Sequence, residues 1–393
     1  MNRVDSMTAP APTVTPAAPV VSPGTSPATP TDGASDLDAI RAVVRDTLAP
    51  LTLKIDEGYY PAEVLRALGA AGTFRQHLAS QNGRGTVDIQ AALSAMDIVS
   101  QECMSTGFMV WAQDVACWYI EMSGNDFLKE TLLPKLACGE ALGGTALSNP
   151  MKYLAGIEPL LISAEETEDA FILNGTLPWV SNLGADHWFG SIFKVGGDEP
   201  RDVMAMVNTS WPGMELKQLA KFCGMEGTGT YALSFTNVRV PKTHVLGDPL
   251  LPYLKKIKAG FVLLQTGMAT GLIEGCIQLC EAVEPRFAHV NCYLDDRPDE
   301  LREELEDARE LIEALSADVF NPSTDFMRSV LEARLLGSEL SLRAANAAML
   351  HTGASGYLHD APAQRKLREA YFVAIVTPAI KHLRKELDVM AAA

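Results

Sequence analysis

The side chains that most often carry out catalysis are scattered in this sequence and do not match the spacing of common catalytic motifs. The seven histidines occur singly, and none stands in a His-Glu-x-x-His pattern. The seven cysteines form no Cys-x-x-Cys pair, and Cys276 and Cys280, four residues apart on an expected helix, lack two further metal ligands nearby. We therefore expect no metal site and interpret the cysteines as reduced thiols that pack as small hydrophobic side chains.

Glycine-rich segments do not have the spacing of phosphate-binding or hydrolase motifs either. Residues 224–229 precede an expected strand, whereas a phosphate-binding loop leads into the N-terminus of a helix. Residues 353–356 (Gly-Ala-Ser-Gly) lack the Gly-x-Ser-x-Gly spacing of a nucleophile elbow. The sequence therefore predicts no general hydrolase or nucleotide-binding motif.

The charge of the chain excludes further classes of protein. Its 393 residues include 49 acidic and 32 basic side chains, and the net charge is −17. This excess argues against nucleic acid and against anionic membranes as partners, because both attract basic surfaces. The apolar stretch 260–273 is shorter than the roughly 20 residues of a membrane span. The N-terminal segment has Arg3 as its single basic residue and no apolar core of a secretory signal, so we expect a cytoplasmic protein.

The elements that must position any site fall into four segments. Residues 1–35 hold seven of the 23 prolines among Ala, Thr and Ser, and we interpret them as a disordered tail. Residues 36–143 have helical spacing of apolar side chains, residues 144–248 have the patterns of strands, and helical spacing returns over residues 249–393. The predicted fold is α+β but mostly α: a helical N-terminal domain, a β-barrel-like middle domain and a C-terminal helical bundle.

Two patterns in the middle segment predict details of the strands. Asn174-Gly175, inside the run 170–180, favours a type I′ turn and therefore a tight hairpin. The apolar alternation that includes Phe235 changes phase at Val238, which indicates a β-bulge or bend.

Three glycines lie four residues apart on one face of an expected helix in the C-terminal segment. Side chains without a Cβ let a second helix approach closely, and this packing offsets the low helix propensity of glycine. We therefore expect a close helix–helix contact at Gly267, Gly271 and Gly275.

Four segments resemble signature segments of the acyl-CoA dehydrogenase family, in the family's order. Residues 133–140 (Leu-Pro-Lys-Leu-Ala-Cys-Gly-Glu) match its Leu-Pro-x-Leu-Ala-x-Gly-Glu run, and residues 174–182 resemble its Asn-Gly-x-Lys-x-Trp-Ile-Thr-Asn. Residues 224–241 resemble its second β signature, and residues 353–370 resemble its last signature. Together these segments span about residues 40–390, and the resemblance implies the fold of that family.

The resemblance also implies a site for FAD between the β domain and the C-terminal helices. At the matching positions, Leu147 and Ser148 would bind the isoalloxazine ring, Trp179 would stack against it, and Ser181 would donate a hydrogen bond near N5. The segment at Gly353 and Ala354 matches a loop that meets the FAD of a neighbouring subunit. The family resemblance therefore implies a homotetramer or homodimer.

The sequence departs from the family where a catalytic base is expected. The slot of the usual Glu after the last signature holds Thr377, followed by Pro378. In members that carry the Glu on the first long C-terminal helix, the matching turn holds Phe261 here, with Gln265 as the only nearby polar side chain. An Arg-x-x-Phe-Gly turn that helps hold the adenine half of FAD is not recognisable, so FMN is the alternative flavin.

These observations leave three functions open. The first is a flavin-dependent oxidoreductase that resembles acyl-CoA dehydrogenases, with a small-molecule substrate such as an acyl-CoA and an electron-transfer partner. The second is a monooxygenase of the same fold that uses reduced flavin from a reductase; Arg365, Arg368 and Pro378 suit that branch, although its histidine before the proline is absent. The third is a non-catalytic homologue that acts as a binding subunit.

Overall fold

The computed structural model describes residues 33–218 and 221–392. Most of the predicted tail lies outside the described residues, but residues 33–35, which we assigned to it, begin the first helix. The helix starts one turn earlier than expected because Asp36 lies in its first turn, where a carboxylate suits the positive end of the helix dipole.

Short helices precede one long buried helix in the N-terminal part of the described chain. Pro61 is the N-cap of α3, and the Asp88 side chain accepts a hydrogen bond from the Ala91 amide at the start of α4. Every residue of α5 is buried, so this helix forms the centre of the fold. The helices are α1 (Gly33–Val43), α2 (Thr52–Asp56), α3 (Ala62–Ala70), α4 (Ile89–Glu102), α5 (Met104–Met122), α6 (Asp126–Thr131) and α7 (Leu133–Ala137).

The strands form one sheet in the order β6-β7-β3-β2-β4-β5-β8, with β1 paired to β4. The Phe189 ring on β4 lies 6.2 Å from the Phe235 ring on β7, although two strands separate β4 from β7 in the sheet. The sheet therefore curls around its own apolar core. The elements are β1 (Gly143–Thr145), α8 (Ser148–Leu154), β2 (Ile162–Glu166), β3 (Ala170–Val180), β4 (Trp188–Val195), β5 (Arg201–Asn208), β6 (Met214–Gln218), β7 (Tyr231–Pro241) and β8 (Val245–Gly247).

The predicted hairpin at Asn174-Gly175 is wrong, because β3 runs straight through both residues. There β3 pairs with β2 on one side and β7 on the other, and these two ladders outweigh the local turn preference. Gly175 has a φ of +139°, and a Cβ there would lie 2.3 Å from the Leu161 carbonyl oxygen. The predicted bulge is confirmed: the register shifts opposite Asn174, where Asn237 has a φ of +52°.

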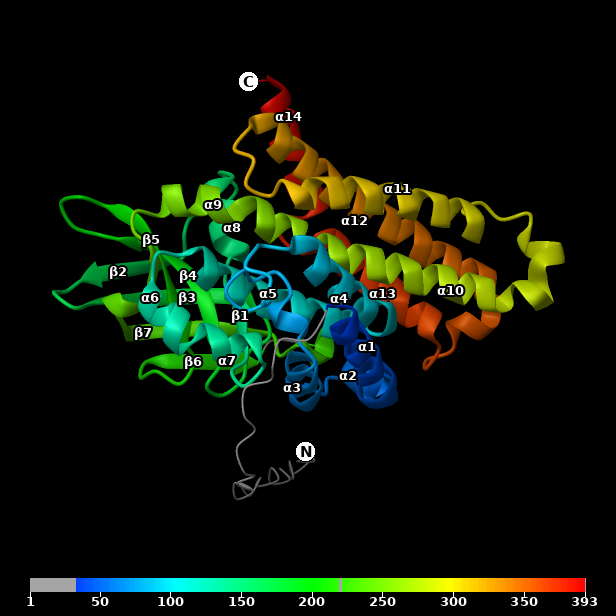
Figure 1. The fold of residues 1–393 in the computed structure, drawn as a ribbon, viewed down its shortest axis with the longest axis horizontal. Helices are drawn as coiled ribbons and strands as arrows, with labels where there is room; N and C mark the ends of the chain where they lie inside the picture. Colours follow the sequence, from blue (N-terminus) through cyan, green and yellow to red (C-terminus); the bar gives the residue numbers. More distant parts are fainter. Residues whose placement is uncertain (1–32, 219–220, 393) are drawn as a thin grey trace, which may run out of the picture. The chain divides into compact units, whose positions relative to one another are not determined.

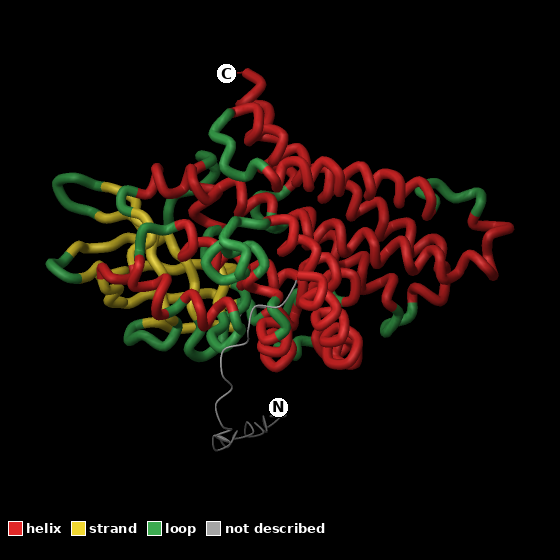
Figure 2. The backbone as a smooth tube through the Cα atoms, in the orientation of Figure 1, coloured by secondary structure: helices red, strands yellow, loops and turns green. Residues whose placement is uncertain are grey.

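Long helices pack together in the C-terminal part and against α4 (Figures 1 and 2). The predicted glycine contact is confirmed, since a Cβ at Gly271 would lie 2.4 Å from the Asp97 carbonyl oxygen and one at Gly275 would lie 2.6 Å from that of Gln101. The helices are α9 (Leu250–Leu263), α10 (Thr266–Asn291), α11 (Pro298–Ala317), α12 (Thr324–Thr352), α13 (Pro362–Ile375) and α14 (Ile380–Ala392).

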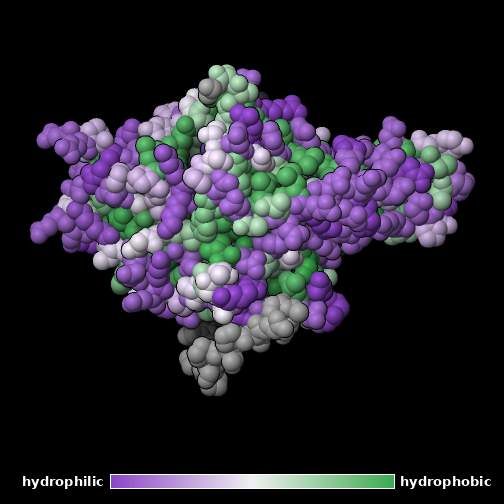
Figure 3. All heavy atoms as spheres, turned by 45° about the horizontal axis from the view of Figure 1, so that its top comes forward, coloured by the Kyte–Doolittle hydropathy of each residue, from purple (hydrophilic) through white to green (hydrophobic). Residues whose placement is uncertain are grey.

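One described helical stretch, Leu250–Asn291, is long and apolar enough to cross a membrane by length and composition. Of its most apolar window, 94% is buried inside the fold, as in the core helix of a soluble protein. Figure 3 shows a mostly hydrophilic surface on the face it draws, with hydrophobic residues gathered near the middle. The apolar character of α9 and α10 is therefore explained by packing.

Candidate active site

A cavity of about 440 Å³ lies where the β domain meets α5, α9 and α13. Its volume is within the range of small-molecule sites, and most of its lining is apolar or aromatic. A larger cavity of about 810 Å³ lies between α1, α4, α10 and α11, and none of the predicted cofactor-binding residues lines it. We therefore take the smaller cavity as the candidate site.

Four of the predicted cofactor-binding residues line this cavity together: Leu147, Ser148, Trp179 and Ser181. Gly353 and Ala354 do not line it; they lie in the short 3₁₀ helix after α12. Their expected contact with a neighbouring subunit stays a prediction. Thr377 and Phe261, from the two expected positions of a base, also line the cavity.

The ends of β1 and β3 position the four predicted cofactor-binding residues that line the cavity. Gly144 in β1 approaches the segment after β3 so closely that a Cβ there would lie 2.3 Å from the Ser181 carbonyl oxygen. The Asn182 side chain fixes the same approach by donating to the Gly143 carbonyl oxygen at 2.6 Å. A register shift near the end of β3 gives Trp179 a φ of +63° and leaves it 50% exposed. The indole ring therefore forms an open aromatic wall.

Hydroxyl groups form most of the polar part of the lining, which also includes the charged side chains of Lys152 and Arg368. The Ser181 hydroxyl lies 2.6 Å from the hydroxyl of Thr230, which lies 2.8 Å from that of Thr228. On the other side, the hydroxyls of Ser148 and Thr377 lie 3.1 Å apart, although 229 residues separate them in the chain. The cavity thus offers several fixed hydrogen-bond donors beside one exposed aromatic face.

Neither expected position of a base holds one. Gln265 is fully buried, and its amide donates to the Thr377 carbonyl oxygen at 2.9 Å. Among the described residues that line the cavity, none is Asp, Glu or His. No lining group in the described part of the chain is therefore ready to take a proton from carbon at neutral pH.

Aromatic rings close the apolar end of the cavity, and the sequence analysis missed most of them. The Phe108 ring lies 4.5 Å from that of Phe372 and 5.6 Å from that of Trp111, whose ring is 5.3 Å from Phe261. Phe108 and Trp111 come from α5, whose apolar character all round hides which side chains face a site. Tyr371 and Phe372 follow the last family signature directly, and this position was the signal available.

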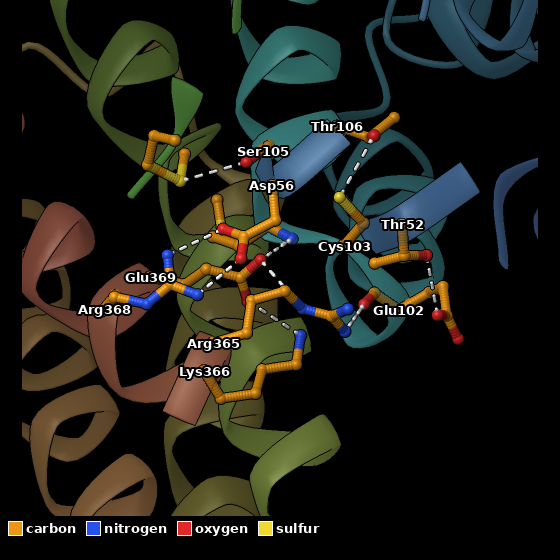
Figure 4. Close-up of polar contacts among 12 residues, drawn as sticks. Thr52, Asp56, Glu102, Cys103, Ser105, Thr106, Arg365, Lys366, Arg368 and Glu369 are labelled. Carbon is orange, nitrogen blue, oxygen red and sulfur yellow. Dashed lines mark hydrogen bonds and ion pairs between the residues drawn. The ribbon is translucent and has the colours of Figure 1, made fainter. Parts of the chain in front are cut away.

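Helix α13 carries Tyr371 and Phe372 of the apolar end. Buried charged side chains hold this helix at the junction of α4 and α5 (Figure 4). Arg365 and Lys366 donate to the carbonyl oxygens of Glu102 and Ser100, at 2.9 and 3.0 Å. Glu369 accepts from the Met104 amide at 3.2 Å. Cations therefore meet the negative end of α4 and a carboxylate meets the positive end of α5, which stabilises this placement of α13.

Arg368 joins α13 to two other parts of the chain at the rim of the cavity. It binds both oxygens of Asp56, and it donates to the Cys223 carbonyl oxygen at 2.9 Å (Figure 4). The hydrogen bond with Asp56 raises the pKa of Arg368, which stays charged. Because Asp56 already pairs with it, Arg368 contributes little net positive charge to the cavity.

The residues present fit a flavin ring. A flat, electron-poor ring system is best held by an aromatic face and a few oriented donors, and Trp179 with the hydroxyls of Ser148 and Ser181 supplies both.

In the described residues there is no group of three or more His, Cys, Asp or Glu side chains that could hold a metal ion.

Comparisons with known proteins agree with this architecture. Residues 36–140 match the family model "Acyl-CoA dehydrogenase, N-terminal domain". A probable acyl-CoA dehydrogenase of Mycobacterium tuberculosis is 24% identical over 348 residues, which cover 84% of this chain and 88% of that protein.

Solved structures show the same fold. Butyryl-CoA dehydrogenase from Megasphaera elsdenii has a TM-score of 0.80 at 18% identity and covers 92% of this chain and 98% of its own. A glutaryl-CoA dehydrogenase from Mycobacterium smegmatis in complex with FADH2 has a TM-score of 0.73 at 18% identity, over 92% and 95%. The chain is therefore a relative of the acyl-CoA dehydrogenases, with their N-terminal domain at residues 36–140 and their fold.

Proposed function

We propose that this chain is an FAD-dependent oxidoreductase that acts on a small, largely apolar substrate without a carboxylate base. The observation that carries the proposal is the composition of the cavity: an open indole face and hydroxyl donors at one end, aromatic rings at the other, and neither acid nor histidine among the described lining residues. Bound FAD would supply two-electron chemistry that these side chains lack.

The residues of the cavity have separate roles in this proposal. Trp179 holds the flavin ring by stacking, and Ser148 and Ser181 orient it through their hydroxyls. Phe108, Trp111 and the neighbouring rings bind the apolar part of the substrate and exclude water. An apolar end of this kind suits a compact acyl group or ring.

The absence of a carboxylate base favours one of two candidate reactions, dehydrogenation and monooxygenation, over the other. Removal of hydrogen from an acyl thioester needs a group that takes the α-proton, and the Thr377 slot holds a hydroxyl that is a poor base at neutral pH. Monooxygenation, in which one atom of O2 goes to the substrate and the other leaves as water while reduced flavin supplies two electrons, needs no such removal of a proton from carbon. The cavity thus favours the reduced-flavin monooxygenase over an acyl-CoA dehydrogenase of the usual mechanism, and a flavin reductase would be its partner.

The visible absorption spectrum of the purified protein, with the released flavin identified by chromatography, is the first test. We expect bound FAD, no bleaching by acyl-CoAs under anaerobic conditions, and substrate-dependent oxygen use once the flavin is reduced. Rapid anaerobic bleaching by an acyl-CoA would assign the dehydrogenase reaction instead. A protein that binds neither FAD nor FMN would support the non-catalytic binding subunit.

We also propose that the protein is a cytoplasmic homodimer or homotetramer. Tyr357 and Leu358, which directly follow the Gly353 segment, are 81% and 63% exposed, and Leu350 is 53% exposed. Large apolar side chains grouped at one exposed turn support a contact with a second copy there. Light scattering after size-exclusion chromatography would test this, and a monomer at micromolar concentration would contradict it.

A further inference from the structure

A buried arginine without an acidic partner lies behind the Thr377 side of the cavity. Arg334 on α12 is 0% exposed, and within residues 33–218 and 221–392 no carboxylate forms an ion pair with it. Its three donor contacts go to neutral acceptors: the Gln265 side-chain oxygen at 2.7 Å, the Ser338 hydroxyl, and the Val373 carbonyl oxygen at 2.8 Å. Burial of a charge is costly unless another charge offsets it, so this cation needs an explanation.

The contacts of Arg334 lead to the cavity in two steps. Gln265 accepts from the guanidinium and, through its amide nitrogen, donates to the carbonyl oxygen of Thr377. Thr377 lines the cavity, and its hydroxyl meets that of Ser148. Two hydrogen bonds therefore connect a fixed positive charge to the backbone of Thr377, whose side chain occupies the place of a base.

The same contacts change the electrostatics of the end of α13. This helix ends at Ile375, two residues before Thr377, and Ile375, Val376 and Thr377 all line the cavity, so the negative end of the helix dipole lies at the cavity. Arg334 binds the carbonyl oxygen of Val373 in the last turn, and Gln265 binds that of Thr377. Without these donors the Thr377 side of the cavity would repel negative charge; with them it carries a net positive contribution.

We infer that Arg334, acting through Gln265, is a positioning residue that makes the Thr377 side of the cavity favourable for negative charge, such as the charge that a flavin gains on reduction. This inference rests on the proposed function. An uncharged side chain at position 265 is essential to it, because a glutamate there would pair with Arg334 and cancel its charge. Burial lowers the pKa of Arg334 to about 10, so the guanidinium still carries its proton at neutral pH.

The test is the midpoint potential of bound FAD, measured without substrate in wild type, Gln265→Glu and Gln265→Met. The loss of one unit charge at a separation on the order of 10 Å, at an effective dielectric constant of about 20, would weaken binding of reduced FAD relative to oxidised FAD on the order of tenfold. We expect Gln265→Glu to lower the midpoint potential accordingly. Gln265→Met keeps the cation uncompensated but loses the amide donor to the Thr377 carbonyl oxygen, so it should lower the potential by less than Gln265→Glu does.

Arg334 variants keep the inference testable if Gln265→Glu does not fold. Arg334→Lys should leave the potential near that of wild type, whereas Arg334→Met should lower it. Equal potentials in the Lys and Met variants, or no shift in Gln265→Glu with FAD bound, would overturn the inference and leave Arg334 as a support for α13. A wild-type protein that binds no flavin would overturn the proposed function, and the inference with it.

Discussion

Replacement of Trp179 by alanine is the sharpest test of the flavin site. The side chain is 50% exposed, and its ring contact within the chain is a tilted one with Phe222 at 5.7 Å. Because the fold gains little from this ring, its loss should cost binding energy and leave the stability of the protein nearly unchanged. Favourable contacts of an aromatic ring contribute about 1–2 kcal/mol, so the Kd for FAD should rise by about 5- to 30-fold.

The assay is a titration of the apoprotein with FAD, followed by the quenching of flavin fluorescence, with thermal unfolding measured in parallel. Trp211→Ala is the matched control. Trp211 packs against Trp188 and His244, with ring distances of 5.7 and 5.1 Å, and does not line the cavity. We expect Trp211→Ala to lower Tm and to leave the Kd unchanged.

Two results would refute the reasoning on Trp179. A Kd within twofold of the wild-type value would mean that the indole does not contact the flavin. A large loss of Tm in Trp179→Ala would mean that the ring stabilises the fold, and the weaker binding could then not be assigned to a lost contact with the ring.

Three further perturbations test other parts of the argument. Gly271→Ala forces a Cβ against the Asp97 carbonyl oxygen at 2.4 Å. Overpacking of this kind costs about 1–3 kcal/mol, and the higher helix propensity of alanine offsets up to about 1 kcal/mol, so Tm should fall. Gly337→Ala is the control and should lower Tm less, because its Cβ would meet only the Ala269 Cβ at 3.0 Å. Equal Tm values for the two variants would show that α4 and α10 separate easily. Thr377→Glu puts a carboxylate in the slot of the usual base. The rate at which the α-protons of a bound acyl-CoA exchange with deuterated solvent should rise on the order of 100-fold, and Thr377→Gln is the control. An unchanged exchange rate would mean that the slot of the base lies elsewhere. For Glu386, burial raises the pKa, but the hydrogen bond from His382 and the charge of Lys258 outweigh burial and lower it to about 2 from 4.5. This carboxylate therefore stabilises the fold above about pH 4.5 and loses its effect as the pH falls toward 2. The difference in Tm between wild type and Glu386→Gln should be largest at neutral pH and shrink in acid. A difference in Tm that stays constant between pH 6 and pH 3 would contradict this assignment.

Local patterns were sufficient for the architecture. The change from helical to alternating spacing and back placed helices, strands and helices in the right order, because periodicity reports which face of each element is buried. The glycines of α10 and the phase change before Val238 were readable for the same reason: each is a local requirement of the backbone. Trp179 and the hydroxyl residues Ser148 and Ser181 could be listed from short segments of sequence, whereas Phe108 and Trp111, on a helix that is buried all round, could not.

What the sequence by itself determined is therefore the set of elements and the chemistry that they carry: a mostly helical chain with a β middle, an aromatic and hydroxyl-rich set of residues at 147, 148, 179 and 181, and no carboxylate in the slot of a base. Only the tertiary structure decided that β3 continues through Asn174-Gly175, that Ser148 meets Thr377, and that Arg334 lies buried behind Gln265. The physical reason is common to all three. Each depends on partners far away in the chain, and neither turn propensity nor periodicity contains information about which distant groups will supply a hydrogen bond or leave a charge unpaired.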